Sequence, residues 1–312
     1  MSLPVSLQHL RLPVICAPMF IVSNPKLVVE QCKAGVVGSF PALNARGEGA
    51  LNEWLTGIKA ELMADEAAGG HPAPFAVNQI VHPSNNRLAE DIQVCLSHQV
   101  PVFITSLQAP PKELVDGAHA YGGIVLHDVI NVRHAKKALE AGVDGLILVA
   151  AGAGGHAGML SPFALVGEIR KFYDGLIVLS GSIATGDAIL GAQAMGADLA
   201  YMGTRFICTT EANADAAYKQ GIIDAAANDV IYTNLFTGVH GNYLRQSIVT
   251  AGLDPDNLPV ADKTKMNFGS GGNSAAKAWK DIWGVGQGVG LIDDAPSTAE
   301  LVDHLEMEYK AA

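Results

Sequence analysis

Eight short apolar runs alternate with helical segments between residues 14 and 206, and this repetition constrains the fold of the chain more than any other feature. The runs are rich in Val, Ile, Leu and Ala. They are residues 14–19, 36–40, 75–80, 102–107, 124–129, 145–150, 176–183 and 199–206. A strand–helix repeat requires a parallel sheet with right-handed crossovers, and eight units is the number that closes a barrel. The sequence therefore predicts an α/β fold, a (β/α)8 TIM barrel.

The segments between the runs carry helical signals. Asn24, Asn131 and Thr185 are residue types that cap helix N-termini. The predicted helices are 25–34, 53–64, 85–98, 111–121, 132–141 and 187–195, with a further helix beginning at 162. An open doubly wound sheet is the alternative architecture, but its usual dinucleotide fingerprint is absent after the first run, which ends at Met19.

The composition indicates a globular chain that carries net negative charge. Of its 312 residues, 49% are hydrophobic and 16% are charged, which is ample for a large core. The 31 Asp and Glu residues outnumber the 20 Lys and Arg residues, and the net charge of −11 disfavours nucleic acid and anionic membrane surfaces as partners. No apolar run approaches the ~20 residues that a spanning helix needs, so no membrane association is expected.

The cysteine spacing and the N-terminal sequence indicate in which cellular compartment the protein is expected. Cys16, Cys32, Cys95 and Cys208 lie far apart and form no Cys-x-x-Cys pair, so we expect free, buried thiols. No basic segment followed by an apolar core stands at the N-terminus, so no secretory signal is predicted and a cytoplasmic location is expected.

The strand–helix pattern stops at Glu211 and resumes only near the C-terminus. We expect residues 211–283 to form a smaller, mainly helical insertion that caps the active site, and residues 1–210 and 284–312 to form the barrel. Ser297 caps a final helix, 297–309, which would be the eighth barrel helix. Aromatic candidates for a substrate pocket beneath the insertion, which could equally be packing residues, are Tyr201, Tyr218, Tyr232, Tyr243 and His240.

Glycine-containing loops follow the seventh and eighth runs, where TIM barrels often bind phosphate. Gly181 and Ser182 lie in the first loop, and Gly203 and Thr204 lie in the second. Small residues leave backbone N–H groups accessible to an anion. Glycines that only make turns are the alternative, but two such loops at the expected positions favour an anion site. A further glycine-rich loop, 284–290, which includes Gln287, either approaches a ligand or makes a linker turn.

One histidine lies among glycines after the sixth run. Residues 148–162 read LVAAGAGGHAGMLSP, so four glycines surround His156 before Ser161 and Pro162 begin a helix. We expect these glycines to interrupt regular structure and to let the backbone approach a ligand closely. Imidazole titrates near neutral pH, so His156 is the candidate catalytic residue; a surface histidine in an ordinary loop is the alternative.

Segments along nearly the whole chain resemble the FMN-dependent nitronate monooxygenases, formerly called 2-nitropropane dioxygenases. In the order of that family, the matching segments are Ala17-Pro18-Met19, Val77-Asn78, Gly154-Gly155-His156-Ala157-Gly158, Ser180-Gly181-Ser182, Met202-Gly203-Thr204-Arg205-Phe206 and Trp283-Gly284-Val285-Gly286-Gln287. Members of the family have a (β/α)8 barrel with a smaller helical domain inserted late in the chain, in agreement with the organisation predicted above.

The resemblance implies that FMN lies across the barrel mouth and that His156 is the catalytic histidine, close to the reactive edge of the flavin. The implied cofactor-binding residues are Met19, Asn78, Gly154, Gly155, Gly181, Ser182, Met202, Gly203 and Thr204. Among these, the residues of the two loops after the seventh and eighth runs would hold the phosphate. Asp128 stands where some relatives have a lysine near the cofactor. No metal is implied.

The reaction implied by the resemblance is oxidation of alkyl nitronates with O2 to a carbonyl compound and nitrite, with nitroalkanes as a further substrate class. His156 would act as a base on a nitroalkane or as a hydrogen-bond donor to the nitro oxygens of a nitronate. Alternatives on the same scaffold are an NAD(P)H-dependent FMN quinone or enoyl reductase and, more remotely, a non-catalytic flavin-binding barrel. The expected partners are a small-molecule substrate and O2, with a homo-oligomer left open beside a monomer.

Overall fold

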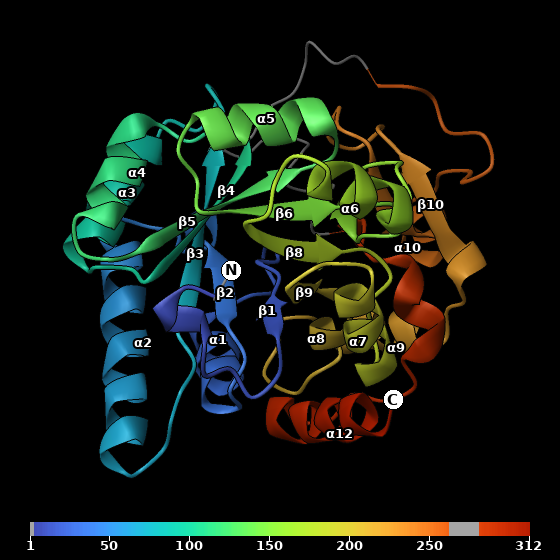
Figure 1. The fold of residues 1–312 in the computed structure, drawn as a ribbon. Coiled ribbons are helices and arrows are strands. Elements are labelled where there is room, and N and C mark those ends of the chain that lie inside the picture. Colours follow the sequence, from blue (N-terminus) through green and yellow to red (C-terminus); the bar gives the residue numbers. More distant parts are fainter. Residues whose placement is uncertain (1–2, 262–280) are drawn as a thin grey trace.

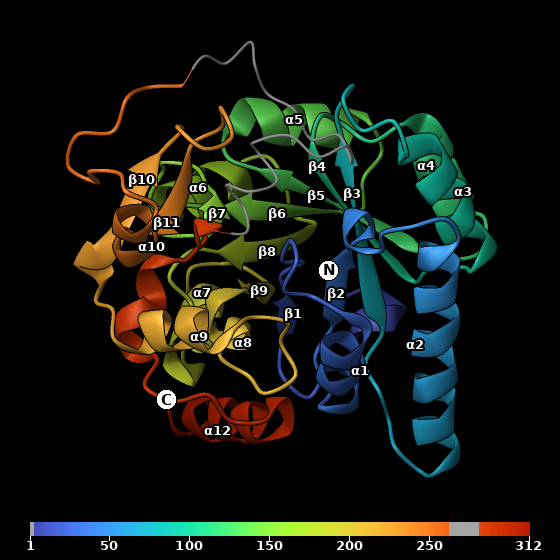
Figure 2. The same ribbon diagram turned by 180° about the vertical axis from the view of Figure 1, so that it is seen from behind.

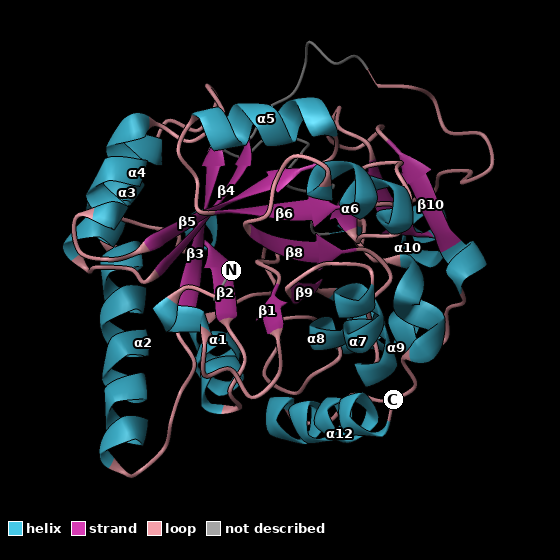
Figure 3. Cartoon of the chain, viewed as in Figure 1, coloured by secondary structure: helices cyan, strands magenta, loops and turns pink. Residues whose placement is uncertain are grey.

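A computed structural model describes residues 3–261 and 281–312, and it contains the predicted barrel. Eight parallel strands form one sheet in the order β1-β9-β8-β6-β5-β4-β3-β2 (Figure 3). The strands are β1 (Val14–Cys16), β2 (Gly38–Pro41), β3 (Phe75–Val81), β4 (Val102–Leu107), β5 (Ile124–Val129), β6 (Gly145–Val149), β8 (Leu176–Ser180) and β9 (Leu199–Met202). Ile15 forms a bridge with Val37, directly before β2, which joins the two edges of the sheet. The fold is therefore a (β/α)8 TIM barrel, as predicted.

Helices surround the strands in alternating order along the chain (Figure 1). They are α1 (Pro25–Lys33), α2 (Ala50–Ala67), α3 (Leu88–Ser97), α4 (Lys112–His119), α5 (Val132–Glu140), α6 (Pro162–Arg170), α7 (Gly186–Ala194) and α12 (Thr298–Ala311). The side chains of Asn24, Asn131, Thr185 and Ser297 each accept a hydrogen bond from the backbone N–H three residues further on, which confirms these N-caps. Helix α12 packs against α7 and α1, in the place of the eighth barrel helix.

Apolar side chains fill both faces of the barrel wall, which explains the nearly continuous hydrophobic runs. Inside the barrel, the fully buried residues include Ile15, Ala76, Ile104, Leu126, Ile147, Val178 and Leu199. Between the strands and the helices they include Val77, Phe103, Val125, Leu146 and Ile177. All four cysteines are free and buried, as predicted. No helix in the described part of the chain is long and apolar enough to cross a membrane.

Strands β1, β8 and β9 end three or more residues earlier than their apolar runs predict, and β1 ends at Cys16 although its run continues to residue 19. Strand β8 ends at Ser180 and β9 ends at Met202, although the runs continue to residues 183 and 206. After β8, Gly181 and Ser182 have φ angles of +133° and +56°, which a strand does not accommodate. After β9, Thr204–Ile207 form a short helix, α8. These breaks bring two loops out onto the mouth of the barrel.

The histidine loop is more regular than its glycines predict. Gly155–His156 form a short strand, β7, which pairs antiparallel with β11 (Gly241–Leu244). Strand β11 also pairs with β10 (Val230–Thr233), giving a three-stranded sheet beside the barrel (Figure 2). The stretch after β9 thus contains strands as well as the helices α9 (Ala216–Ile223) and α10 (Arg245–Thr250). Part of the predicted insertion, residues 262–280, lies outside the described residues.

The start of α7 lies against the backbone of α12. A Cβ atom on Gly186 would lie 2.5 Å from Leu305 O and would collide with the backbone nitrogen of Tyr309, and neither atom can rotate away. We expect Gly186→Ala to lower the free energy of unfolding by about 1–3 kcal/mol, measured by urea denaturation, because the two helices must separate.

Gly191→Ala is the matched control for this prediction. Gly191 lies on the same helix, and no atom lies within 4 Å of the position that its Cβ atom would take. Alanine should therefore leave the free energy of unfolding unchanged or raise it by up to ~1 kcal/mol. Equal effects of the two substitutions would contradict the close approach of α7 and α12.

Candidate active site

A cavity of about 1240 Å³ opens at the carboxyl ends of the barrel strands. Pockets for one drug-sized molecule occupy roughly 300–1,000 Å³, so this cavity has room for more than one ligand. The predicted residues that line it are Met19, Asn78, Gly154, Gly155, His156, Gly181, Ser182, Gly203 and Thr204. Functional residues of TIM barrels lie at this end of the strands, which makes the cavity the candidate active site.

Met202 is the predicted site residue that does not line the cavity. Side chains alternate along a strand, so Tyr201 faces the barrel interior while Met202 faces the helices. The side chain of Met202 is fully buried against neighbours that include Cys16 and Phe206. Any contact between Met202 and a ligand would therefore involve its backbone only.

The aromatic candidates divide into two groups. Tyr201 and Tyr218 line the cavity. Tyr218 stacks on Trp283 with ring centroids 5.0 Å apart, and its hydroxyl donates to Gly284 O at 2.7 Å. The other three side chains do not line the cavity: the Tyr243 ring packs edge-on against Phe236, and Tyr232 and His240 stack on each other.

His156 projects into the cavity from β7, and its ring is oriented by a hydrogen bond. Its Nε2 lies 2.9 Å from Thr237 Oγ1, and the Thr237 hydroxyl donates to Val239 O at 3.0 Å. Thr237 is therefore the acceptor, which places a proton on Nε2 and leaves Nδ1 as the basic nitrogen. Burial lowers the pKa of His156 to about 4, so the imidazole is neutral at pH 7. Sequence reasoning missed Thr237, because nothing near residue 156 indicates a partner 81 residues later.

Glycine loops pack against one another along one wall of the cavity. A Cβ atom on Gly154 would lie 2.8 Å from Gly286 N, and one on Gly286 would lie 2.7 Å from Gly152 O. The Gln287 N–H donates to Gly152 O at 2.9 Å, and the Gly286 N–H donates to Thr204 Oγ1 at 2.9 Å. Loop 284–290 is therefore part of the cavity wall, and only glycine fits where its backbone meets the histidine loop.

Several backbone N–H groups in the loops after β8 and β9 make no hydrogen bond with any described residue. They include those of Gly181, Gly203 and Thr204, all of which line the cavity. Ser182, beside Gly181, holds a positive φ of 56°, a strained conformation for a residue with a side chain. Accessible N–H groups of this kind are suited to hold an anion such as a phosphate.

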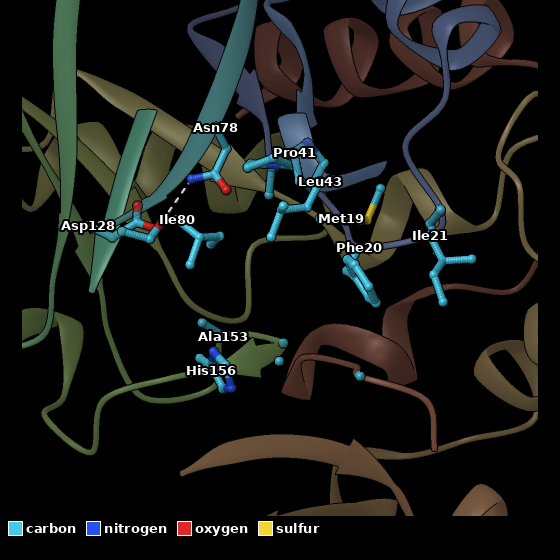
Figure 4. Close-up of a pocket in the computed structure, with 18 of the residues that line it drawn as sticks. Met19, Phe20, Ile21, Pro41, Leu43, Asn78, Ile80, Asp128, Ala153 and His156 are labelled. Atoms are coloured by element: carbon cyan, nitrogen blue, oxygen red, sulfur yellow. Dashed lines mark hydrogen bonds between the residues drawn. The ribbon is translucent and has the colours of Figure 1, made fainter. Parts of the chain in front are cut away.

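Polar side chains from three adjacent strands form a connected chain at the inner end of the cavity. Asn78 Nδ2 donates to Ser106 Oγ at 2.8 Å, and the Ser106 hydroxyl donates to Asp128 Oδ2 at 2.6 Å (Figure 4). Burial raises the pKa of Asp128 to about 7. The hydrogen bond from Ser106 lowers this pKa, but by less than burial raises it. Figure 4 shows Asn78 and Asp128 at one side of the cavity and His156 at another.

A cavity at the mouth of a TIM barrel, lined by a histidine and by glycine loops, is the arrangement of a TIM-barrel enzyme. The sequence pattern of one family, nitronate monooxygenase, matches residues 3–308. The chain belongs to the nitronate monooxygenase family and is an oxidoreductase, which confirms the resemblance seen in the sequence.

Individual proteins agree with this assignment. The chain is 28% identical to a nitronate monooxygenase of Paraburkholderia phytofirmans, over 96% of this chain and 92% of that protein. It is 27% identical to a nitronate monooxygenase of Neurospora crassa, over 95% and 89%. Among solved structures, a nitroalkane oxidase of Streptomyces ansochromogenes aligns with a TM-score of 0.74 at 23% identity, covering 96% of both chains. FabK of Thermotoga maritima aligns with a TM-score of 0.76 at 23% identity, covering 98% of this chain and 94% of that chain, so both share the fold.

Proposed function

We propose that this chain is an FMN-dependent enzyme that oxidises alkyl nitronates with O2 to a carbonyl compound and nitrite. The observation that carries the proposal is the arrangement of one cavity, in which a neutral His156 and a wall of glycine loops with accessible backbone N–H groups lie at the mouth of the barrel. The names of the two relatives above support nitronates as the substrate class.

The residues of the cavity fit FMN. The N–H groups of Gly181, Gly203 and Thr204 suit a phosphate, with Ser182 beside them. Met19, Gly154, Gly155 and Asn78 offer apolar, backbone and amide contacts to a ring lying over the barrel mouth. When bound, the flavin supplies the redox chemistry, while the protein supplies binding and orientation. In the same proposal, residues 211–283 form a cap domain over a barrel made of residues 1–210 and 284–312.

The protonation state of His156 favours nitronates over nitroalkanes as substrates. Removal of a proton from a nitroalkane would use Nδ1 as the base, and a group with a pKa of about 4 is a weak base at pH 7. A nitronate is already an anion, so no proton has to be removed. Its negative charge would raise the pKa of His156, and a protonated Nδ1 would then donate a hydrogen bond to a nitro oxygen. The protein thereby orients the substrate while Thr237 holds the other ring nitrogen.

Anaerobic mixing of the FMN-loaded protein with three compounds tests the proposal. We expect propionate 3-nitronate to bleach the flavin absorbance faster than 3-nitropropionate by roughly 10²–10⁴, the range of a general-base contribution, and NADH to leave the spectrum unchanged. Stopped-flow absorbance gives the three rates. Bleaching by NADH alone would contradict the proposal and favour the reductase alternative, in which His156 positions a different substrate.

A further inference from the structure

Four polar side chains cover the core of the barrel and form the floor of the cavity. Along their strands, each stands two residues beyond a buried apolar residue of the interior, so all four point inward. They are Asn78 after Ala76, Ser106 after Ile104, Asp128 after Leu126 and Tyr201 after Leu199. Any ring that spans the barrel mouth lies over this layer.

Two atoms of this floor are buried and have no hydrogen-bond partner among the described residues. They are Asp128 Oδ1 and the hydroxyl oxygen of Tyr201. Tyr201 is only 7% exposed. No cation of the described chain lies within ion-pair distance of Asp128. Buried polar atoms in native proteins are nearly always hydrogen-bonded, so these two atoms indicate polar groups on a ligand.

The hydrogen bonds of Asn78 fix the orientation of its amide. Its Nδ2 lies 3.3 Å from Ile104 O, and a backbone carbonyl can only accept. The same nitrogen donates a hydrogen bond to Ser106 Oγ, and the Ser106 hydroxyl in turn donates its one hydrogen bond to Asp128 Oδ2. Both amide protons of Asn78 are therefore used within the floor, and its Oδ1 remains as an acceptor for a ligand N–H.

We propose that Asp128, as a neutral acid, and Tyr201 donate hydrogen bonds to carbonyl oxygens on the edge of the flavin ring, while Asn78 accepts one from a ring N–H. This inference rests on the proposed binding of FMN. The pyrimidine half of the flavin ring carries C=O and N–H groups along one edge, which matches one acceptor beside two donors. An ionised Asp128 would instead repel the carbonyl oxygens, so flavin binding weakens as this acid loses its proton.

The other titratable groups that face Asp128 keep one charge state near pH 7. Burial raises the pKa of Tyr201, from β9, well above its usual value. Burial lowers the pKa of His156, on β7, to about 4, and it also lowers the pKa of His134, on α5 at the cavity wall. A change of flavin binding at or above pH 7 would therefore belong to Asp128.

The experiment measures the dissociation constants of FMN and riboflavin from apoprotein by quenching of flavin fluorescence, between about pH 5.5 and pH 8.5. Riboflavin is included because it lacks a phosphate, which itself titrates at about pH 6. We expect the riboflavin dissociation constant of the wild type to rise roughly tenfold across this range, as expected for the loss of one good hydrogen bond. Asp128→Asn should abolish this rise, and His134→Gln, which changes another titratable side chain of the cavity, should retain it.

Further outcomes keep the inference separate from the proposed cofactor. Tyr201→Phe should weaken riboflavin binding several-fold at every pH, since it removes a donor that does not titrate in this range. A wild-type protein that binds flavin with no pH dependence, or an Asp128→Asn variant that retains it, would overturn this inference alone. Failure of the wild type to bind FMN or riboflavin at any pH would overturn the proposed cofactor as well. The wild-type titration needs no variant, so it decides the matter even if Asp128→Asn does not fold.

Discussion

His156→Ala is expected to lower kcat/KM for a nitronate by roughly 10²–10⁴ while FMN stays bound. The imidazole is the titratable group that β7 and Thr237 hold in the cavity, and its removal leaves the substrate without an oriented hydrogen-bond donor. The loops assigned to the phosphate are separate from it, so flavin content should not change. Oxygen consumption gives the rate, and the absorbance of the bound flavin gives the cofactor content.

The control is His134→Ala, since His134 also lines the cavity but belongs to α5, whereas His156 belongs to β7. We expect this variant to retain the wild-type rate. Thr237→Val should give an intermediate loss, because the imidazole remains but its Nε2 loses the acceptor at 2.9 Å. Equal rates for the wild type and His156→Ala would remove His156 from the mechanism.

Gly181→Ala is expected to weaken FMN binding roughly tenfold to a hundredfold and to leave riboflavin binding nearly unchanged. Gly181 has a φ of +133°, and a Cβ atom there would lie 2.6 Å from the backbone oxygen of Ala151. Strain of this kind costs about 1–3 kcal/mol, so the loop should turn its N–H group away from the phosphate. The ratio of the riboflavin and FMN dissociation constants measures the loss.

Gly167→Ala serves as the control for this substitution. Gly167 lies within α6 with no atom within 4 Å of a Cβ position, so alanine should change neither dissociation constant. A parallel loss of riboflavin and FMN affinity in Gly181→Ala would show a general distortion of the cavity, and would contradict a phosphate site at this loop.

The barrel could be predicted from the sequence because both faces of its strands are buried. Runs such as 102–107 and 124–129 coincide with β4 and β5, since no polar residue has to face water along them. Strand ends were harder to predict. The apolar residues Ile183 and Phe206 extend the predicted runs past Ser180 and Met202, whereas the strands stop at the positive φ angles of Gly181 and Ser182 and before α8.

The candidate site could be predicted as far as it follows the strand ends. Asn78, Asp128 and the loops at Gly181 and Gly203 line the cavity because parallel strands bring their carboxyl ends to one place. The side chain of Met202 does not follow this rule, because the alternation along β9 turns it toward the helices. Contacts between distant segments, such as His156 with Thr237, leave no local pattern in a sequence.

The pairing of β7 with β11 joins the histidine loop to a hairpin outside the eight-stranded sheet. Gly241 and Asn242 are registered against His156 and Gly155, and Ala157 N–H donates to His240 O, so the hairpin sets the direction of the imidazole. Strand β11 also reaches the loop after β9, because the Val285 N–H donates to Asn242 O and the neighbouring Gly286 N–H donates to Thr204 Oγ1. Redesign of the β10–β11 hairpin for new substrates therefore has to keep the contact between Asn242 and Val285 if the cofactor site is to stay unchanged.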